Sequence, residues 1–146
     1  MKKDPRTLYQ EVILRHNKAP VHYEKRENAA YRLDAYNPIC GDRFTLYLDI
    51  ADDRITQLHF QGYGCTLSKA STSVLAEKLT GLPVNEALGL CRSFLAVIHP
   101  APGQEAAAIA DDTFAAFAPA RDFPGRETCA TLSWDEMRIF LEKLHS

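Results

Sequence analysis

The sequence of 146 residues contains no apolar stretch long enough to cross a bilayer, and no apolar run follows its basic start at 1–6. It also lacks a basic run, an internal repeat and a phosphate-binding loop. With 17 Lys and Arg against 19 Asp and Glu, the net charge of −2 gives no electrostatic reason to expect a nucleic-acid partner. We therefore expect a cytoplasmic protein with no membrane span, no secretory signal and no nucleic-acid partner. The length suits a single domain, 1–146, with its own core.

Cysteine is scarce, and none of the four cysteines belongs to a CxxC pair. In a reducing compartment, spaced cysteines bind metal or perform thiol chemistry more often than they form structural disulfides. Cys91 lies in an apolar, helix-like segment, where a free cysteine behaves as a small hydrophobe, and we expect it in the core. Cys40, Cys65 and Cys129 each lie at a turn or element boundary beside a glycine or a polar residue. These three are the candidates for chemistry.

The hydrophobic pattern predicts an α+β fold, in which helices cover one face of a small, mainly antiparallel sheet. Asp4-Pro5 is a typical helix start, because a capping side chain precedes proline at the first helical position. Alternating apolar residues on either side of Asp52-Asp53 predict a β-hairpin. The expected helices cover 5–17, 69–79 (capped by Ser68 or a neighbour), 83–98, 104–118 and a segment that begins after Cys129. The expected strands cover 31–36, 44–50 and 55 to about 62, with loops at 21–30 and 119–125.

The hairpin is expected to bring two of the candidate cysteines together. Its far ends, Asp42 and Gly62, lie side by side, so Cys40 and Cys65 should share one rim of the sheet. Glycine at 62 and 64 allows a sharp turn immediately before Cys65.

A carboxylate accompanies these thiols. Cys40 and Asp42 are one residue apart, so in extended backbone both side chains point to the same side. Spacing alone favours separate roles for such widely separated cysteines, whereas their positions at turns and boundaries favour a shared site. Three thiolates and one carboxylate suit tetrahedral zinc, and three thiolates could also hold an iron–sulfur cluster. The weaker oxygen ligand suits an exchangeable site better than a purely structural one. The five histidines lack ligand spacing, and we expect them to be structural or solvated.

Three ordered motifs carry a resemblance to a known family. They are NPICGD at 37–42, GYGCTLSKASTS at 62–73 and CATLSW at 129–134. Together they resemble the IscU/NifU-like iron–sulfur cluster assembly proteins over most of the chain. The chain looks most like the SufU branch, because a long segment with an insertion at 104–118 separates Cys65 from Cys129. In addition, Thr128 stands where the IscU branch has a histidine ligand.

The resemblance implies a sulfurtransferase-like partner of a pyridoxal-phosphate cysteine desulfurase of the SufS type. Such a protein accepts persulfide sulfur and passes it to downstream cluster-assembly proteins. The resemblance implies zinc ligation by Cys40, Asp42, Cys65 and Cys129, sulfur acceptance by Cys40, and steering of the persulfide by Arg126.

Two alternatives remain open at this stage. One is a scaffold that assembles a [2Fe–2S] cluster, with iron in place of zinc, on the same ligands. The other is a structural zinc domain that only binds a partner. Two positions depart from the family pattern: Thr128, where SufU proteins often have lysine, and Lys69, which is usually apolar.

Overall fold

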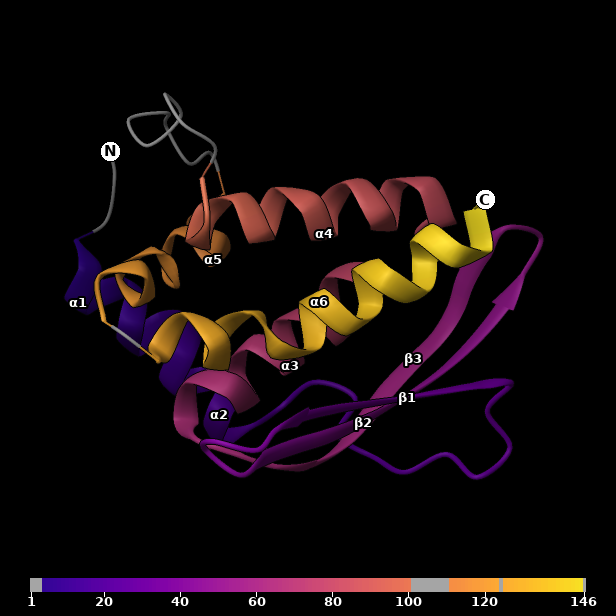
Figure 1. The fold of residues 1–146 in the computed structure, drawn as a ribbon, viewed down its shortest axis with the longest axis horizontal. Coiled ribbons are helices and arrows are strands. Elements are labelled where there is room, and N and C mark those ends of the chain that lie inside the picture. Colours follow the sequence, from indigo (N-terminus) through magenta and orange to yellow (C-terminus); the bar gives the residue numbers. More distant parts are fainter. Residues whose placement is uncertain (1–3, 101–110, 124, 146) are drawn as a thin grey trace.

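The computed structural model describes residues 4–100, 111–123 and 125–145. Its helical elements are α1 (Pro5–Leu8), η1 (Tyr9–Leu14), α2 (Arg15–Lys18), α3 (Thr66–Leu79), α4 (Val84–Ile98), α5 (Asp112–Ala115), η2 (Ala118–Asp122) and α6 (Arg126–His145). The strands are β1 (Tyr31–Asn37), β2 (Asp42–Ala51) and β3 (Arg54–Tyr63). They form one antiparallel sheet in the order β1-β2-β3, with the helices on one of its faces (Figure 1). The predicted α+β fold is confirmed.

The predicted hairpin is present as β2 and β3. Asp52 and Asp53 both have positive φ, 53° and 61°, which matches the twist of the strands in a tight two-residue turn. Phe44 pairs with Gly62 at the other end of the hairpin, as expected from the sequence. β1 adds a second hairpin, whose closing pair is Asn37 with Asp42. The loop between this pair carries Cys40.

The core lies between the sheet and α4, with α3 and α6 in the middle layer (Figure 1). Phe94 of α4 stacks on Trp134 of α6, with ring centroids 4.3 Å apart, and Phe114 meets Trp134 edge-on. Stacked and edge-on aromatic pairs add stability beyond their buried area. Cys91 is fully buried on α4, so its predicted place in the core is confirmed.

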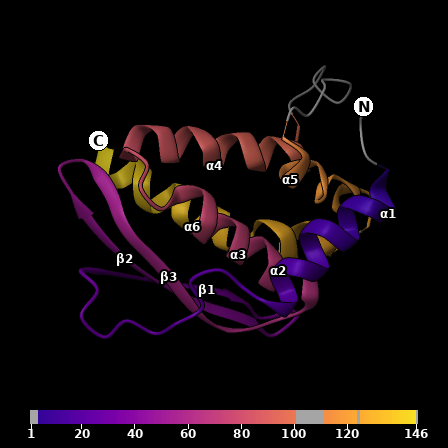
Figure 2. The same cartoon turned by 180° about the vertical axis from the view of Figure 1, so that it is seen from behind.

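The N-terminal helical segment from α1 to α2 runs beside α3 (Figure 2). Asp4 caps it by accepting a hydrogen bond from the Thr7 amide, as its position before proline predicted. The predicted loop at 21–30 contains a short parallel pairing, in which Tyr23 lies beside Phe60 of β3. Among the described helices, none combines the length and apolar character needed to span a bilayer.

Two predicted helix starts are wrong by about one turn. α3 begins at Thr66, because the Cys65 side chain acts as its N-cap, a role for which residue preferences favour Ser, Thr, Asp or Asn. α6 begins at Arg126, directly after Gly125 with a φ of 88°, so Cys129 lies inside the first turns of the helix and not before it.

The predicted helix at 104–118 lies partly outside the described residues. Its described end contains α5, and η2 occupies much of the predicted loop at 119–125.

Candidate metal centre

The loop between β1 and β2 presents Cys40 at its tip. Asn37 anchors the loop, because its side-chain oxygen accepts from the Ile39 amide at 3.1 Å and its carbonyl accepts from the Gly41 amide at 2.8 Å. Gly41 has a φ of 77°, in the left-handed region that favours glycine. Ile39 and Cys40 are both exposed at this turn.

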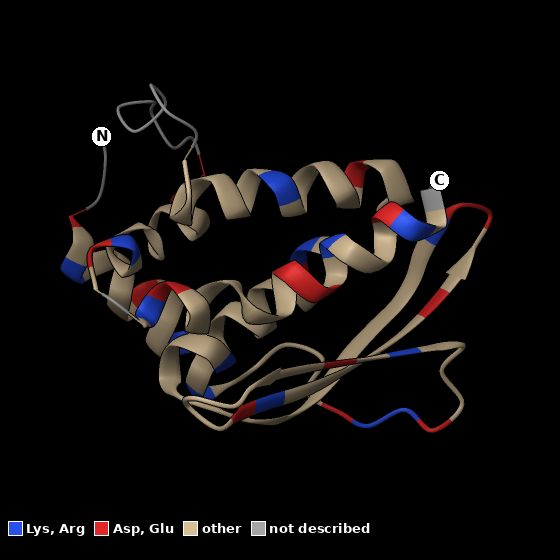
Figure 3. Ribbon diagram, viewed as in Figure 1, with Lys and Arg blue, Asp and Glu red and all other residues tan. Residues whose placement is uncertain are grey.

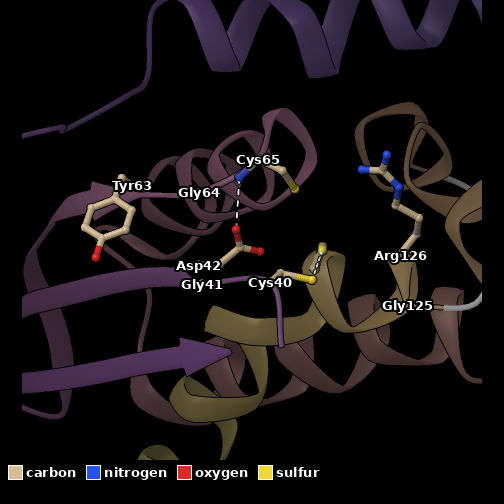
Figure 4. Close-up of a pocket in the computed structure, with 9 residues that line it drawn as sticks. Cys40, Gly41, Asp42, Tyr63, Gly64, Cys65, Gly125 and Arg126 are labelled. Carbon is tan, nitrogen blue, oxygen red and sulfur yellow. Dashed lines mark hydrogen bonds between the residues drawn. The ribbon is translucent and has the colours of Figure 1, made fainter. Parts of the chain in front are cut away.

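Asp42, the first residue of β2, is buried below this loop with only 2% exposed. Its Oδ1 accepts a hydrogen bond of 3.0 Å from the Cys65 amide (Figure 4). Its Oδ2 is buried and has no hydrogen-bond partner. Gly64 permits this close packing, since a Cβ at that position would lie 2.9 Å from Asp42 Oδ1 and would also collide with Ser68 Oγ.

Cys65 is held at the N-terminus of α3. Its Sγ accepts from the Ser68 amide at 3.4 Å and lies 3.5 Å from Ser68 Oγ. The Ser68 hydroxyl also donates to the Cys65 carbonyl at 3.1 Å. Asp42 and Ser68 therefore fix both the backbone and the side chain of Cys65.

Cys129 reaches the same place from α6. It is 3% exposed, and its thiol donates to Cys40 Sγ across 3.9 Å. Burial raises the pKa of Cys129, and the neighbouring Cys65, Asp42 and Cys40 raise it further. The thiolate form of Cys129 therefore needs a compensating positive charge.

The structure brings three of the four predicted ligands together. One ligand atom each of Cys40, Asp42 and Cys129 lies within 4.8 Å of the others. Cys65 lines the same cavity of about 730 Å³, but its sulfur is outside this group. Arg126, the predicted steering residue, also lines the cavity and lies on the opposite side from Tyr63 (Figure 4).

The chemistry of these donors fits a thiophilic cation. A bound cation would satisfy the unpaired Oδ2 of Asp42 and would compensate the thiolate charge of Cys129. Sulfur and oxygen donors of this kind suit zinc or iron. Cys65 lines the same cavity and could supply a fourth ligand.

Two residues that support the site, Ser68 and Gly64, are not predicted in this role from the sequence. Ser68 was expected as a possible cap of α3, whereas it stabilises the cysteine that caps the helix. Ser68 lies three residues after Cys65, which is the spacing between an N-cap residue and the N3 residue that it bonds. This spacing is the feature of the sequence that indicates the role of Ser68. The sequence predicts a sharp turn at Gly64, and the structure adds its close approach to Asp42.

Comparison with known proteins shows the family of the chain. Residues 8–130 match the NifU-like N terminal domain. Over 128 residues the chain is 32% identical to "Zinc-dependent sulfurtransferase SufU" of Bacillus subtilis (strain 168), covering 88% of this chain and 85% of that protein. Over 138 residues it is 34% identical to "Iron-sulfur cluster assembly scaffold protein IscU" of Streptococcus pyogenes serotype M1, covering 93% and 84%.

Among solved structures, the fold is similar to a putative iron–sulfur cluster assembly scaffold protein for the SUF system from Fervidobacterium islandicum AW-1. The TM-score is 0.79 at 28% identity, with 93% of this chain and 98% of that chain covered. Since the domain match spans most of the chain and the similarity extends to both sequence and fold, the chain belongs to the IscU/NifU-like family of iron–sulfur cluster assembly proteins, as a member of the SufU type.

Proposed function

We propose that this chain accepts sulfur from a pyridoxal-phosphate cysteine desulfurase of the SufS type and passes it to downstream cluster-assembly proteins. In this proposal Cys40, Asp42, Cys65 and Cys129 bind zinc, and Cys40 is the sulfur acceptor. One observation carries it: the exposed thiol of Cys40 lies in a group with a buried thiol and a buried carboxylate whose Oδ2 has no partner.

The four proposed ligands differ in how firmly the fold holds them. Asp42 begins a central strand, Cys65 caps α3, and Cys129 is within α6. Cys40 lies on an exposed loop next to Gly41. Its release from a metal would therefore disturb the fold least, and three ligands would remain. When bound, zinc would keep the Cys40 sulfur deprotonated at neutral pH.

Sulfur transfer to Cys40 requires no external oxidant or reductant. The Cys40 thiolate attacks the outer sulfur of the desulfurase persulfide and forms a new S–S bond. The S–S bond within the desulfurase persulfide breaks, and the desulfurase cysteine leaves as a thiolate. Cys40 then carries the persulfide.

Arg126 supports this step by its charge and position. It is exposed at the cavity, at the start of α6, and its guanidinium would attract an approaching anionic persulfide. The name of the Bacillus subtilis relative, a zinc-dependent sulfurtransferase, supports the same function.

A second candidate function is a scaffold for a [2Fe–2S] cluster, which the names of the Streptococcus pyogenes and Fervidobacterium islandicum proteins favour. The exposed Thr128 argues against it, because the position carries a hydroxyl in place of the histidine of the IscU branch. Metal analysis of protein purified anaerobically without added iron separates the two functions. Zinc supports the first, and iron with acid-labile sulfide supports the second.

Mass spectrometry of the chain after incubation with desulfurase and cysteine tests the proposal. We expect a mass increase of one sulfur atom at Cys40 and faster alanine release by the desulfurase. Cys40→Ser should remain folded and show neither effect, whereas the core variant Cys91→Ala should show both. Persulfide on Cys129, with Cys40→Ser still active, would transfer the acceptor role to Cys129.

A further inference from the structure

The face of the sheet opposite the helices carries an exposed row of two tyrosines and one arginine. Tyr36, Arg43 and Tyr63 are cross-strand neighbours on β1, β2 and β3. The Arg43 guanidinium lies 4.4 Å from the centroid of the Tyr36 ring, in a cation–π contact. Tyr36 is 49% exposed and Tyr63 is 66% exposed, which is high for aromatic side chains on a folded domain.

Two further cations also lie over tyrosine rings, Arg32 on this face of the sheet and Lys69 on α3, in the helical layer. Arg32 lies 5.8 Å from the ring centroid of Tyr47, and Lys69 lies 5.1 Å from that of Tyr23. Among the described residues, no carboxylate forms an ion pair with Arg43, Arg32 or Lys69.

A hollow of about 420 Å³ lies beside this row. Its charged lining residues are Lys25, Arg32 and Arg43, and no acidic residue lines it. Elsewhere on the described chain, acidic and basic residues are interspersed (Figure 3), in keeping with the net charge of −2. Lys25 pairs with Glu27 at 3.7 Å, so Arg32 and Arg43 carry the unpaired positive charge of the hollow.

Tyr63 connects this hollow to the cysteine cavity. It lines both, and its ring points away from the sulfur atoms (Figure 4). Ile39, 93% exposed, lies beside Cys40. A protein that brings a persulfide to Cys40 therefore meets the exposed Ile39 and the rim of the cavity, to which Tyr63 belongs. A stable interface covers about 800 Å² per partner, so the contact extends well past the cavity onto neighbouring surface.

We propose that the Tyr36–Arg43–Tyr63 row and its hollow form the docking surface for the cysteine desulfurase, and that they bind an acidic segment beside its persulfide cysteine. The inference rests on the proposed function. Tyrosine and arginine are enriched among the residues that contribute most to binding energy. Because each cation already lies over a ring, less conformational freedom is lost on binding.

Charge decides between the possible occupants of this face. A second copy of the chain, docked face to face, would place Arg43 and Arg32 of each copy against cations of the other, which disfavours association. Asp34 lies on the same face but accepts a hydrogen bond from Thr45 and forms no ion pair with Arg32 or Arg43. An acidic segment would supply the carboxylates that these two arginines lack. The same charges would increase the rate of encounter at low salt.

The binding affinity of the zinc-loaded chain for the purified desulfurase of the same organism tests the proposal. Arg43→Glu should weaken binding by about tenfold at low salt, and Arg43→Lys should restore most of the affinity. Arg32→Glu, at the end of the hollow away from the cysteines, should weaken binding in the same direction. Arg92→Glu is the matched control, because Arg92 is exposed on α4, in the layer farthest from the sheet. It should bind like the parent, and zinc content should be equal in all variants.

Persulfide formation on Cys40 of the parent is measured in parallel. If Cys40 acquires sulfur while both charge reversals bind like the parent, the docking surface is wrong and the proposed function stands. If Cys40 acquires no sulfur but the reversals still weaken binding, the proposed function is wrong and the docking surface stands. Sedimentation gives the remaining outcome: a parent dimer that Arg43→Glu dissociates, with unchanged desulfurase binding, would assign the face to self-association and overturn the inference.

Discussion

Asp42 has two proposed roles: it accepts a hydrogen bond from the Cys65 amide, and it offers a negative oxygen to a metal. Replacing it by asparagine separates these roles, because the change removes the charge but keeps the size and one oxygen acceptor. The side-chain oxygen of the introduced asparagine can still accept from the Cys65 amide, which in the parent binds Asp42 Oδ1 at 3.0 Å. The unpaired Oδ2 is replaced by an amide nitrogen and no longer offers a negative ligand atom. We therefore expect the free energy of unfolding of metal-free Asp42→Asn to lie within about 1 kcal/mol of that of the parent.

The zinc-dependent part of the stability should fall. Mutation of a residue that hydrogen-bonds to a metal ligand typically weakens metal affinity by about 10–100-fold. Loss of a ligand itself should weaken the affinity by at least about 100-fold. A hundredfold weaker Kd removes about 2.7 kcal/mol of stabilisation when zinc is in excess. For a chain of this length, that corresponds to a Tm lower by about 5–11 °C.

Thermal unfolding in excess chelator measures the stability of the metal-free protein, and thermal unfolding in buffered free zinc measures the added stabilisation by zinc. Parent and Asp42→Asn should have similar Tm values with chelator and should separate when zinc is added. An equal zinc-dependent rise in Tm for the two proteins would refute ligation by Asp42. Asp42→Ala should be less stable even with chelator, by about 1–3 kcal/mol, because the Cys65 amide loses its acceptor.

Three further predictions concern the thiols and a buried histidine. In the protein stripped of metal by a chelator, the thiol oxidant diamide should form a disulfide between Cys40 and Cys129, because their sulfurs are 3.9 Å apart. Peptide mapping without reductant would show this disulfide, and bound zinc should prevent it. Cys91 should resist alkylation at pH 8 until the protein is unfolded, since burial raises its pKa to about 12; rapid labelling of folded protein would contradict this. Burial lowers the pKa of His16, whose Nδ1 bonds Ser73 Oγ at 2.7 Å, so the unfolded chain binds the proton more readily. Its contribution to stability should be complete above about pH 6.5 and should fall at lower pH. Urea unfolding of the chelated protein at pH 7.5 and 5.0 should show a smaller loss for His16→Gln than for the parent, and equal losses would refute the prediction.

The sequence alone determined the elements and several of their faces. Apolar and polar residues alternate on both sides of Asp52-Asp53, and this pattern predicted the hairpin. In a strand with one buried face, every second side chain points to the core. The apolar surroundings of Cys91 predicted its burial, and the motifs around Cys40, Cys65 and Cys129 predicted the candidate site. These features depend on local periodicity and on short-range backbone preferences, which neighbouring residues specify.

The helix starts show where local reasoning was insufficient. A thiol is a rare cap, so only the contact with Ser68 revealed that Cys65 begins α3. The loop motif likewise predicts Asp42 as a ligand but does not reveal that it also anchors the Cys65 backbone.

Only the tertiary structure decided which groups meet. Cys40 and Cys129 are 89 residues apart in the chain, and they come into contact because α6 packs across β1 and α3. The row formed by Tyr36, Arg43 and Tyr63 depends on the register of three strands, in which a shift of one residue would turn each side chain to the other face. Such distances and registers follow from the packing of whole elements on a shared core, and no short stretch of sequence specifies them.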